Sequence, residues 1–278
     1  TLLMKWFGRD LEGYSWSFVL SHLWYGFRCF FFFKRPVRFL LNYLGKKSQA
    51  GQVIELRHGL KIALGDHPHD IITVFVVFAR REYGRIQPGS VVLDVGANIG
   101  VFALYAASQG ARRVLAFEPN QRSYDVLAAN IRINSLENVV TAFQSAVSAD
   151  ESPTVRFPVE SSPYNAILEG ESDAAFQWVE NQTIHQVLAR ENIESVDLLK
   201  LDCEGAEHDI LMRAEESDLA AIHAIRMEYH RGRVDELCSF LGMHGLHPIL
   251  WRKDANESGK LWFERSTGQK LGFGGGTR

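Results

Sequence analysis

Residues 91–100, Val-Val-Leu-Asp-Val-Gly-Ala-Asn-Ile-Gly, contain a buried strand, a glycine turn and the start of a helix. The strand part is apolar except for Asp94, as expected of a parallel strand that is covered on both faces. Gly96 and Gly100 have no Cβ, so the backbone can turn sharply there and approach a ligand closely. The helical pattern from Val101 onward would point free N–H groups at that ligand. The stretch therefore predicts a cofactor site.

The details of the turn indicate which cofactor it binds. A dinucleotide fingerprint has a second glycine where this chain has Asn98, so that the pyrophosphate can approach the backbone. Asp94 stands two residues before the first glycine, where its charge would repel phosphates. The same charge suits a ligand that carries an ammonium and a sulfonium. We therefore expect S-adenosylmethionine at this turn.

A second carboxylate follows the next strand. Residues 113–117 are mostly apolar and lead into Glu118-Pro119-Asn120. A carboxylate at the carboxyl end of the neighbouring strand can accept hydrogen bonds from both ribose hydroxyls of an adenosine. Ser145-Ala146, after the third strand, is expected beside the same adenosine. The predicted cofactor-binding residues up to this point are Asp94, Gly96, Ala97, Asn98, Gly100, Glu118, Asn120, Ser145 and Ala146.

An acidic cluster follows a later apolar strand, in Lys200-Leu201-Asp202-Cys203-Glu204-Gly205-Ala206-Glu207. With this segment, the D-V-G-A-N-I-G turn and the F-E-P-N strand end, the chain resembles the FkbM family of class I methyltransferases. The match runs from about Val91 to Glu207 and, more weakly, to His230. The resemblance implies a Rossmann-like fold and methylation of hydroxyl groups on varied acceptors, including polyketides and sugars. It also implies that Asp202 faces the methionyl end of S-adenosylmethionine.

Methylation of an alcohol would be helped by a base near the acceptor oxygen, because an alcohol is a weak nucleophile. The candidates follow strands near the switch point of the sheet. We predict Asp202, Glu204 and His230 as catalytic residues, with Glu228 as a further candidate, and the ordinary pKa of histidine suits a base at neutral pH. The same cluster is an alternative Mg²⁺ site. Its spacing gives no definite ligand set, so no metal is predicted.

Strands and helices alternate after residue 90, which predicts an α/β fold with a mostly parallel seven-stranded sheet and helices on both faces. The last two strands are joined by a polar loop with no room for a helix, so this pair should be an antiparallel hairpin at the sheet edge. The expected strands lie near residues 91–96, 113–118, 139–147, 196–203, 222–230, 247–252 and 260–265. The expected helices lie near residues 99–109, 121–134, 183–191, 206–214 and 233–242.

The chain divides into four parts. Residues 1–50 are predicted to form an aromatic and basic N-terminal extension, and residues 51–88 a small β-hairpin and a helix that lead into the core. Residues 89–267 are the expected S-adenosylmethionine-binding domain, and residues 268–278 a disordered tail. Residues 148–170, rich in proline and acidic residues, are either a lid on the acceptor side or a surface excursion.

The segment from Tyr14 to Arg38 is dense in aromatic residues and ends in a basic run. The apolar run within it, from Tyr14 to Phe33, has roughly the ~20 residues that a membrane-spanning helix needs, but His22 and Arg28 interrupt it. A charge at bilayer depth costs at least about 2.5 kcal/mol, and no small-residue cleavage site of a secretory signal follows. The remaining alternatives are contact with a membrane surface, packing on its own domain, or homodimerisation.

Composition restricts the partners. The 278 residues carry a formal net charge of −3, which gives no overall basic field and disfavours nucleic acid. The three cysteines, Cys29, Cys203 and Cys238, lie far apart, as expected of reduced thiols in the cytoplasm. We expect an S-adenosylmethionine-dependent O-methyltransferase that acts on a small molecule, saccharide or polyketide-type acceptor. An RNA methyltransferase and a non-catalytic S-adenosylmethionine-binding protein are the alternatives.

Overall fold

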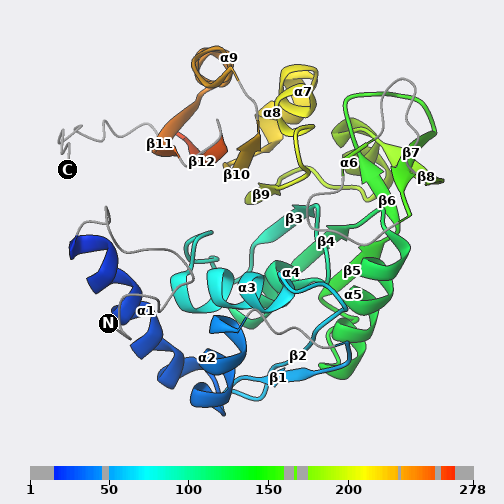
Figure 1. Ribbon diagram of the computed structural model, residues 1–278. Helices are drawn as coiled ribbons and strands as arrows, with labels where there is room; N and C mark the ends of the chain where they lie inside the picture. The colour runs from blue at the N-terminus through cyan, green and yellow to red at the C-terminus, as the bar shows by residue number, and fades with distance from the viewer. Residues whose placement is uncertain are drawn as a thin grey trace.

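One seven-stranded β-sheet organises the chain (Figure 1). The computed structural model describes residues 16–45, 50–159, 166–167, 175–230, 233–253 and 258–266. The strands of the sheet are β3 (Val91–Val95), β4 (Arg113–Phe117), β5 (Val140–Phe143), β9 (Leu198–Leu201), β10 (Ala224–His230), β11 (Leu246–Lys253) and β12 (Ser258–Arg265). Their spatial order is β11-β12-β10-β9-β3-β4-β5. The chain thus enters the middle of the sheet at β3, builds one half, and crosses back to build the other.

The five strands from β5 to β10 run parallel, whereas β12 is antiparallel to both of its neighbours. Only residues 254–257 separate β11 from β12, which is too short a connection for the crossover that a parallel pair needs. These observations confirm the predicted fold, a mostly parallel sheet of seven strands with an antiparallel last strand.

Alternate residues of the central strands face two different hydrophobic cores. In β3, Val92 belongs to one core, and Leu93 and Val95 belong to the other. Because helices cover both faces (Figure 1), the strand is apolar on both sides, as predicted. The first core includes α4 (Val101–Ser108) and α5 (Gln121–Ile133); the second includes α6 (Ile184–Arg190), α7 (Glu207–Met212), α8 (Glu216–Ala221) and α9 (Val234–Met243).

The N-terminal elements pack on the first core. They are α1 (Trp16–Phe32), α2 (Pro36–Leu44), β1 (Val53–Glu55), β2 (Lys61–Ala63), α3 (Asp70–Val74) and a π-helical segment, η2 (Phe75–Arg80). β1 and β2 form the predicted antiparallel hairpin. Cys29, Phe33 and Phe39 are buried in the same core as Val92, so α1 and α2 contribute to the core of the domain. No described helix is long and apolar enough to cross a membrane.

Residues 139–147 differ from the single strand that the sequence predicts. The chain leaves the main sheet after Phe143, and β6 (Ser145–Val147) joins β8 (Phe176–Gln182) and β7 (Thr154–Pro158) in a three-stranded sheet of order β6-β8-β7. β8 was not predicted because its buried positions include Asn181 and Gln182, which break the apolar pattern. α8, also unpredicted, has only six residues.

Part of the predicted insertion at 148–170 forms β7. Residues 160–165 and 168–170 of that insertion, like the predicted tail at 268–278, lie outside the described residues.

Gly96 directly follows β3 and packs against the backbone of Asp202, which directly follows β9. Its φ is +74°, and a Cβ at this position would lie 1.9 Å from the backbone oxygen of Asp202. We expect Gly96→Ala to lower the free energy of unfolding by at least about 3 kcal/mol, because it combines left-handed strain with a backbone clash. Gly59→Ala is the matched control, since Gly59 has a φ of +95° and open space around it.

Urea denaturation of both variants measures the difference. The control should lose only about 1–2 kcal/mol, from left-handed strain alone. Equal losses in the two variants would show that the clash with Asp202 is relieved at little cost.

Candidate active site

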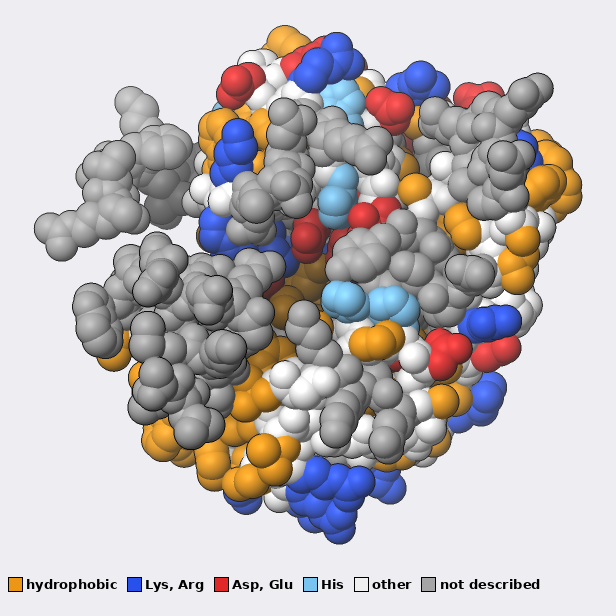
Figure 2. Space-filling model, in the orientation of Figure 1, with side chains coloured by type: hydrophobic (Ala, Val, Ile, Leu, Met, Phe, Trp, Pro, Cys, Tyr) orange, Lys and Arg blue, Asp and Glu red, His pale blue; other side chains and the backbone are white. Residues whose placement is uncertain are grey.

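A cavity of about 360 Å³ opens at the carboxyl ends of β3, β4, β9 and β10. This is the switch point, where the chain turns from one half of the sheet to the other and where open α/β sheets bind ligands. Figure 2 shows a hollow near the centre of this face, with Asp and Glu side chains in it and His side chains along its edge. The volume falls in the usual range of small-molecule sites.

The predicted glycine turn forms one wall of the cavity. The backbone N–H groups of Gly96 and Ala97 both donate to the carbonyl oxygen of Phe117, at 3.1 and 2.9 Å, which fixes the turn to β4. Gly96, Ala97 and Asn98 line the cavity. Gly100 has a structural role instead, because a Cβ there would lie 2.4 Å from Leu127 of α5.

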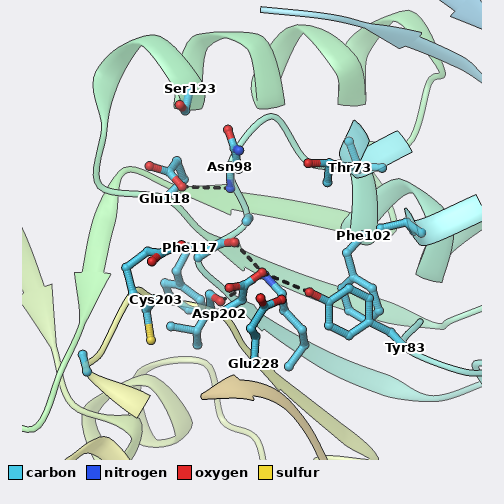
Figure 3. A pocket seen from close by; sticks show the side chains of 18 of the residues that line it. Thr73, Tyr83, Asn98, Phe102, Phe117, Glu118, Ser123, Asp202, Cys203 and Glu228 are labelled. Atoms are coloured by element: carbon cyan, nitrogen blue, oxygen red, sulfur yellow. Dashed lines mark hydrogen bonds and ion pairs between the residues drawn. The ribbon is translucent and has the colours of Figure 1, made fainter. Parts of the chain in front are cut away.

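Glu118 lies at the end of β4, facing the cavity (Figure 3). Its carboxylate accepts the backbone N–H groups of Asn98 and Asn120, each at 2.8 Å. Burial raises the pKa of Glu118 to about 7, against the opposing effect of these two hydrogen bonds. A carboxylate has further lone pairs, so the predicted ribose contact fits this position. Asn120 itself caps α5 by accepting from the N–H groups of Arg122 and Ser123.

Asp94 is completely buried behind the turn, so it supports the site from outside the cavity lining. Lys200 of β9 lies 3.1 Å from its carboxylate and donates to the carbonyl oxygen of Gly96 at 2.6 Å. Burial raises the pKa of Asp94, and the charge of Lys200 opposes that rise. Burial also opposes the charged form of Lys200, but Asp94 and Asp202 outweigh it and raise the pKa of Lys200.

Asp202 lines the cavity at the end of β9. Its Oδ2 accepts the hydroxyl of Tyr83 at 3.0 Å (Figure 3). Tyr83 is buried, and both burial and the nearby charges of Asp202 and Glu228 raise its pKa well above the usual value. Glu228 of β10 also lines the cavity and pairs with Lys260 of β12 at 3.1 Å. Each of these two carboxylates is therefore held by a donor from another part of the chain.

Glu204 also lines the cavity, in a left-handed backbone conformation with a φ of +56°. Burial raises its pKa to about 7, although the nearby charge of His230 lowers it. His230 lies behind Glu204, with Nε2 at 3.4 Å from it and Nδ1 at 3.2 Å from Glu207. Burial lowers the pKa of His230, but the hydrogen bond and charge of Glu207, together with Glu204, raise it to about 9. At neutral pH this histidine is thus protonated, contrary to the ordinary pKa on which its predicted role as a base was based.

The three predicted catalytic residues are close together. Asp202, Glu204 and His230 each offer a potential ligand atom, and these atoms lie within 4.8 Å of one another. Mg²⁺ prefers oxygen ligands, whereas one of the three is an imidazole that already lies between two glutamates. The prediction that no metal is required stays a prediction.

Several residues of the site were not predicted from the sequence. Ser145 and Ala146 line the cavity as expected, and so do the unpredicted Tyr83, Lys200 and Lys260. The sequence did offer one signal that Lys200 belongs to the site, because a charged side chain inside an apolar strand needs a buried partner. Tyr83 and Lys260 gave none, because they reach the cavity only through the packing of distant segments.

The strand order, the antiparallel β12 and the cavity at the switch point together define a class I S-adenosylmethionine-dependent methyltransferase. The family model described as the methyltransferase FkbM domain matches residues 94–250. The chain belongs to the FkbM methyltransferase family.

Two curated relatives show how far the similarity extends. The AMB antimetabolite synthetase AmbE of Pseudomonas aeruginosa is 30% identical over 228 residues, covering 64% of this chain and 11% of AmbE. The methyltransferase sdnD of Sordaria araneosa is 29% identical over 208 residues, covering 63% of this chain and 75% of sdnD. The match therefore spans only about a tenth of AmbE but three quarters of sdnD.

Solved structures overlap with the chain more loosely. The complex of M. capricolum TrmK with S-adenosyl-homocysteine gives a TM-score of 0.44 at 10% identity, over 67% of this chain and 66% of that one. The ribosomal protein L11 methylase of Lactobacillus delbrueckii subsp. bulgaricus gives 0.41 at 16% identity, over 73% and 81%. Scores below 0.5 carry no information on the substrate of this chain.

The Lys200–Asp94 pair yields a stability prediction. We expect Lys200→Met to lower the free energy of unfolding by about 3–5 kcal/mol at neutral pH, because Asp94 remains buried without a counter-charge. Without the lysine, the folded-state pKa of Asp94 lies still further above its unfolded value. The folded variant then binds more protons than the unfolded chain, so its loss of stability should shrink as the pH falls.

The double variant Lys200→Met/Asp94→Leu is the control, and it should recover most of the loss because neither charge remains. Urea denaturation at several pH values measures both. A double variant as unstable as the single one would attribute the effect to packing of the lysine stem instead of charge.

Proposed function

We propose that the protein methylates a hydroxyl group of a small-molecule, saccharide or polyketide-type acceptor. The observation that supports this proposal best is Glu204, a cavity-lining carboxylate whose pKa of about 7 suits a general base at neutral pH. A hydroxyl acceptor needs such a base more than a neutral amine does, because an alcohol is the weaker nucleophile.

The chain's residues fit S-adenosylmethionine, which supplies an electrophilic methyl group when bound. Glu118 offers acceptor oxygens to a pair of ribose hydroxyls, and Ser145-Ala146 lies where we expect the adenine. Asp202, on the side of β9, provides the negative charge that a sulfonium and an ammonium favour. Asp94 acts indirectly in this arrangement, since it holds Lys200 and, through Lys200, the carbonyl oxygen of Gly96.

Glu204 would accept the proton of the acceptor hydroxyl as its oxygen attacks. Its neighbour His230 is cationic at neutral pH and is itself held by Glu207. A cation at 3.4 Å keeps the pKa of Glu204 from rising further, so the carboxylate form stays available. In this proposal His230 is a positioning residue, while Asp202 and Glu204 face the reacting groups.

Cofactor affinity tests the placement of adenosine. We expect Glu118→Ala to weaken S-adenosylmethionine binding by about 2 kcal/mol, or roughly thirtyfold, because a charge-assisted hydrogen-bonding group is lost. Glu118→Gln keeps one carbonyl acceptor and should lose less. Isothermal titration calorimetry gives both values, with thermal unfolding as a check on the turn. Unchanged affinity in Glu118→Ala would refute the placement.

The pH profile tests the base. The carboxylate is the active form, so kcat/KM should rise with pH through about 7 and then level off. Glu204→Gln should lower kcat at least about 100-fold and remove this inflection, with cofactor affinity unchanged. Glu216→Gln, at an exposed position on α8, is the control. It should keep both the kcat and the pH inflection of the unchanged protein. If Glu204→Gln kept the inflection, the group that titrates near pH 7 would be a residue other than Glu204.

The acceptor class is tested with radiolabelled S-adenosylmethionine and three sets of acceptors. These are saccharides and polyketides with free hydroxyls, the matching amines, and total tRNA. Label on a hydroxyl oxygen that depends on Glu204 supports the proposal. Preferential labelling of tRNA would favour an RNA methyltransferase, and tight cofactor binding without any transfer would indicate a non-catalytic binding protein.

A further inference from the structure

The neighbouring helices α1 and α2 both expose large apolar side chains. Those of α1 follow the i, i+3, i+4, i+7 spacing of a single helix face, whereas Cys29 of α1 and Phe33, directly after α1, enter the core. Trp24 is 57% exposed, Phe31 63% and Leu41 65%. These side chains, called here the α1–α2 face, are Leu20, Leu23, Trp24, Phe27, Phe30, Phe31, Val37 and Leu41. Large exposed apolar side chains gathered on two neighbouring helices are typical of an interaction site.

The surroundings of this face are basic. Residues 16–44 contain no aspartate or glutamate, and the neighbouring β1–β2 hairpin contains one acid, Glu55, which pairs with Lys34 at 2.7 Å. Arg57 donates from its Nε to the carbonyl oxygen of Phe30 at 2.8 Å, so the hairpin lies against the end of α1. Figure 2 shows Lys and Arg side chains gathered at the lower edge of the molecule. Arg35, Arg38 and Lys61 line a pocket between α2 and the hairpin, Lys34 pairs with Glu55, and Arg57 contacts the end of α1.

We propose that the α1–α2 face docks the protein on an anionic membrane surface, with its aromatic side chains at the headgroup boundary. Anionic headgroups offer the charge that Arg35 and Arg38 need, and Trp and Phe suit this depth. A symmetric dimer through the same face would bring cations near cations and would offer them no acid of residues 16–44 as a counter-charge, which is unfavourable. The charges at the face therefore select lipid over a second copy.

Arg28, which interrupts the apolar run in the sequence, does not obstruct this docking. It is half-buried beside the face, with its guanidinium 5.5 Å from the ring centroid of Phe32. The apolar side chains can therefore enter the headgroup region without taking a buried charge with them.

η2 connects the proposed docking helix to the catalytic cavity. Arg80 of η2 lies over the ring of Tyr25 of α1, at 5.6 Å from its centroid, and the same arginine lines the cavity with Val76 and Val77. Docking through α1 would thus place the cavity near the membrane surface. The proposal does not depend on which acceptor is methylated.

Flotation of the full chain with vesicles tests the proposal. The vesicles consist of phosphatidylcholine with phosphatidylserine, or of phosphatidylcholine alone. The protein should float with the anionic vesicles at about 0.1 M salt and detach at about 1 M, where the Debye length falls to about 3 Å. Arg35→Gln/Arg38→Gln should lower partitioning on the order of tenfold or more, and Trp24→Ser/Phe31→Ser should abolish it.

Two matched variants serve as controls. Trp178→Ser removes a tryptophan from β8 that is 65% exposed, against 57% for Trp24. Arg132→Gln removes an exposed cation from α5. Neither variant should change flotation. Brominated phosphatidylserine should quench the fluorescence of Trp24. The quenching that Trp24 contributes should disappear in Trp24→Phe, a substitution that keeps an aromatic side chain at this exposed position.

Three outcomes would overturn the proposal. The first is no flotation with either vesicle, and the second is flotation that the α1 variants leave unchanged. The third is a doubled mass in sedimentation without lipid that Trp24→Ser/Phe31→Ser restores to one chain, which would make the face a dimer interface.

Discussion

The buried ion pair between Lys200 and Asp94 is the interaction on which the site depends. The two residues stand opposite each other on β9 and β3, and the lysine also donates to the carbonyl oxygen of Gly96. One ammonium thereby fixes the glycine turn against the strand that leads to Asp202. The desolvation of both charges is costly, but it is offset because each is the other's counter-charge and the lysine also has backbone acceptors.

The acids around the cavity are likewise held by partners from other parts of the chain. Asp202, Glu204 and Glu228 would repel one another if left alone, yet each has a partner from a separate element: Tyr83, His230 and Lys260 respectively. Different partners give the carboxylates different properties. Asp202 accepts from the neutral hydroxyl of Tyr83 and lies 3.9 Å from the ammonium of Lys200. Burial raises the pKa of Glu204 to about 7, although the charge of His230 opposes this rise. An enzyme can draw both a fixed charge and a base from such a set.

The N-terminal helices have two faces with different consequences. Their inward side, with Phe33 stacked on Phe39 at 3.8 Å between ring centroids, completes the core that supports α4. Their outward side is apolar without any described protein contact to explain it. Stability accounts for the inward side, and membrane docking is our proposal for the outward side. Since α1 also contacts η2, a single helix links the outer surface to the cavity wall.

The sequence by itself determined the sheet, its antiparallel edge, the glycine turn and the carboxylate of Glu118, because strand, turn and helix signals are local and parallel topology follows from their alternation. Only the tertiary structure decided which groups meet. Tyr83 reaches Asp202 across 119 residues, a contact that no local pattern encodes. His230 carries the pKa of an ordinary histidine in the sequence, but two glutamates brought beside it by folding make it a cation, because Coulomb interactions depend on distance in space and not on separation along the chain.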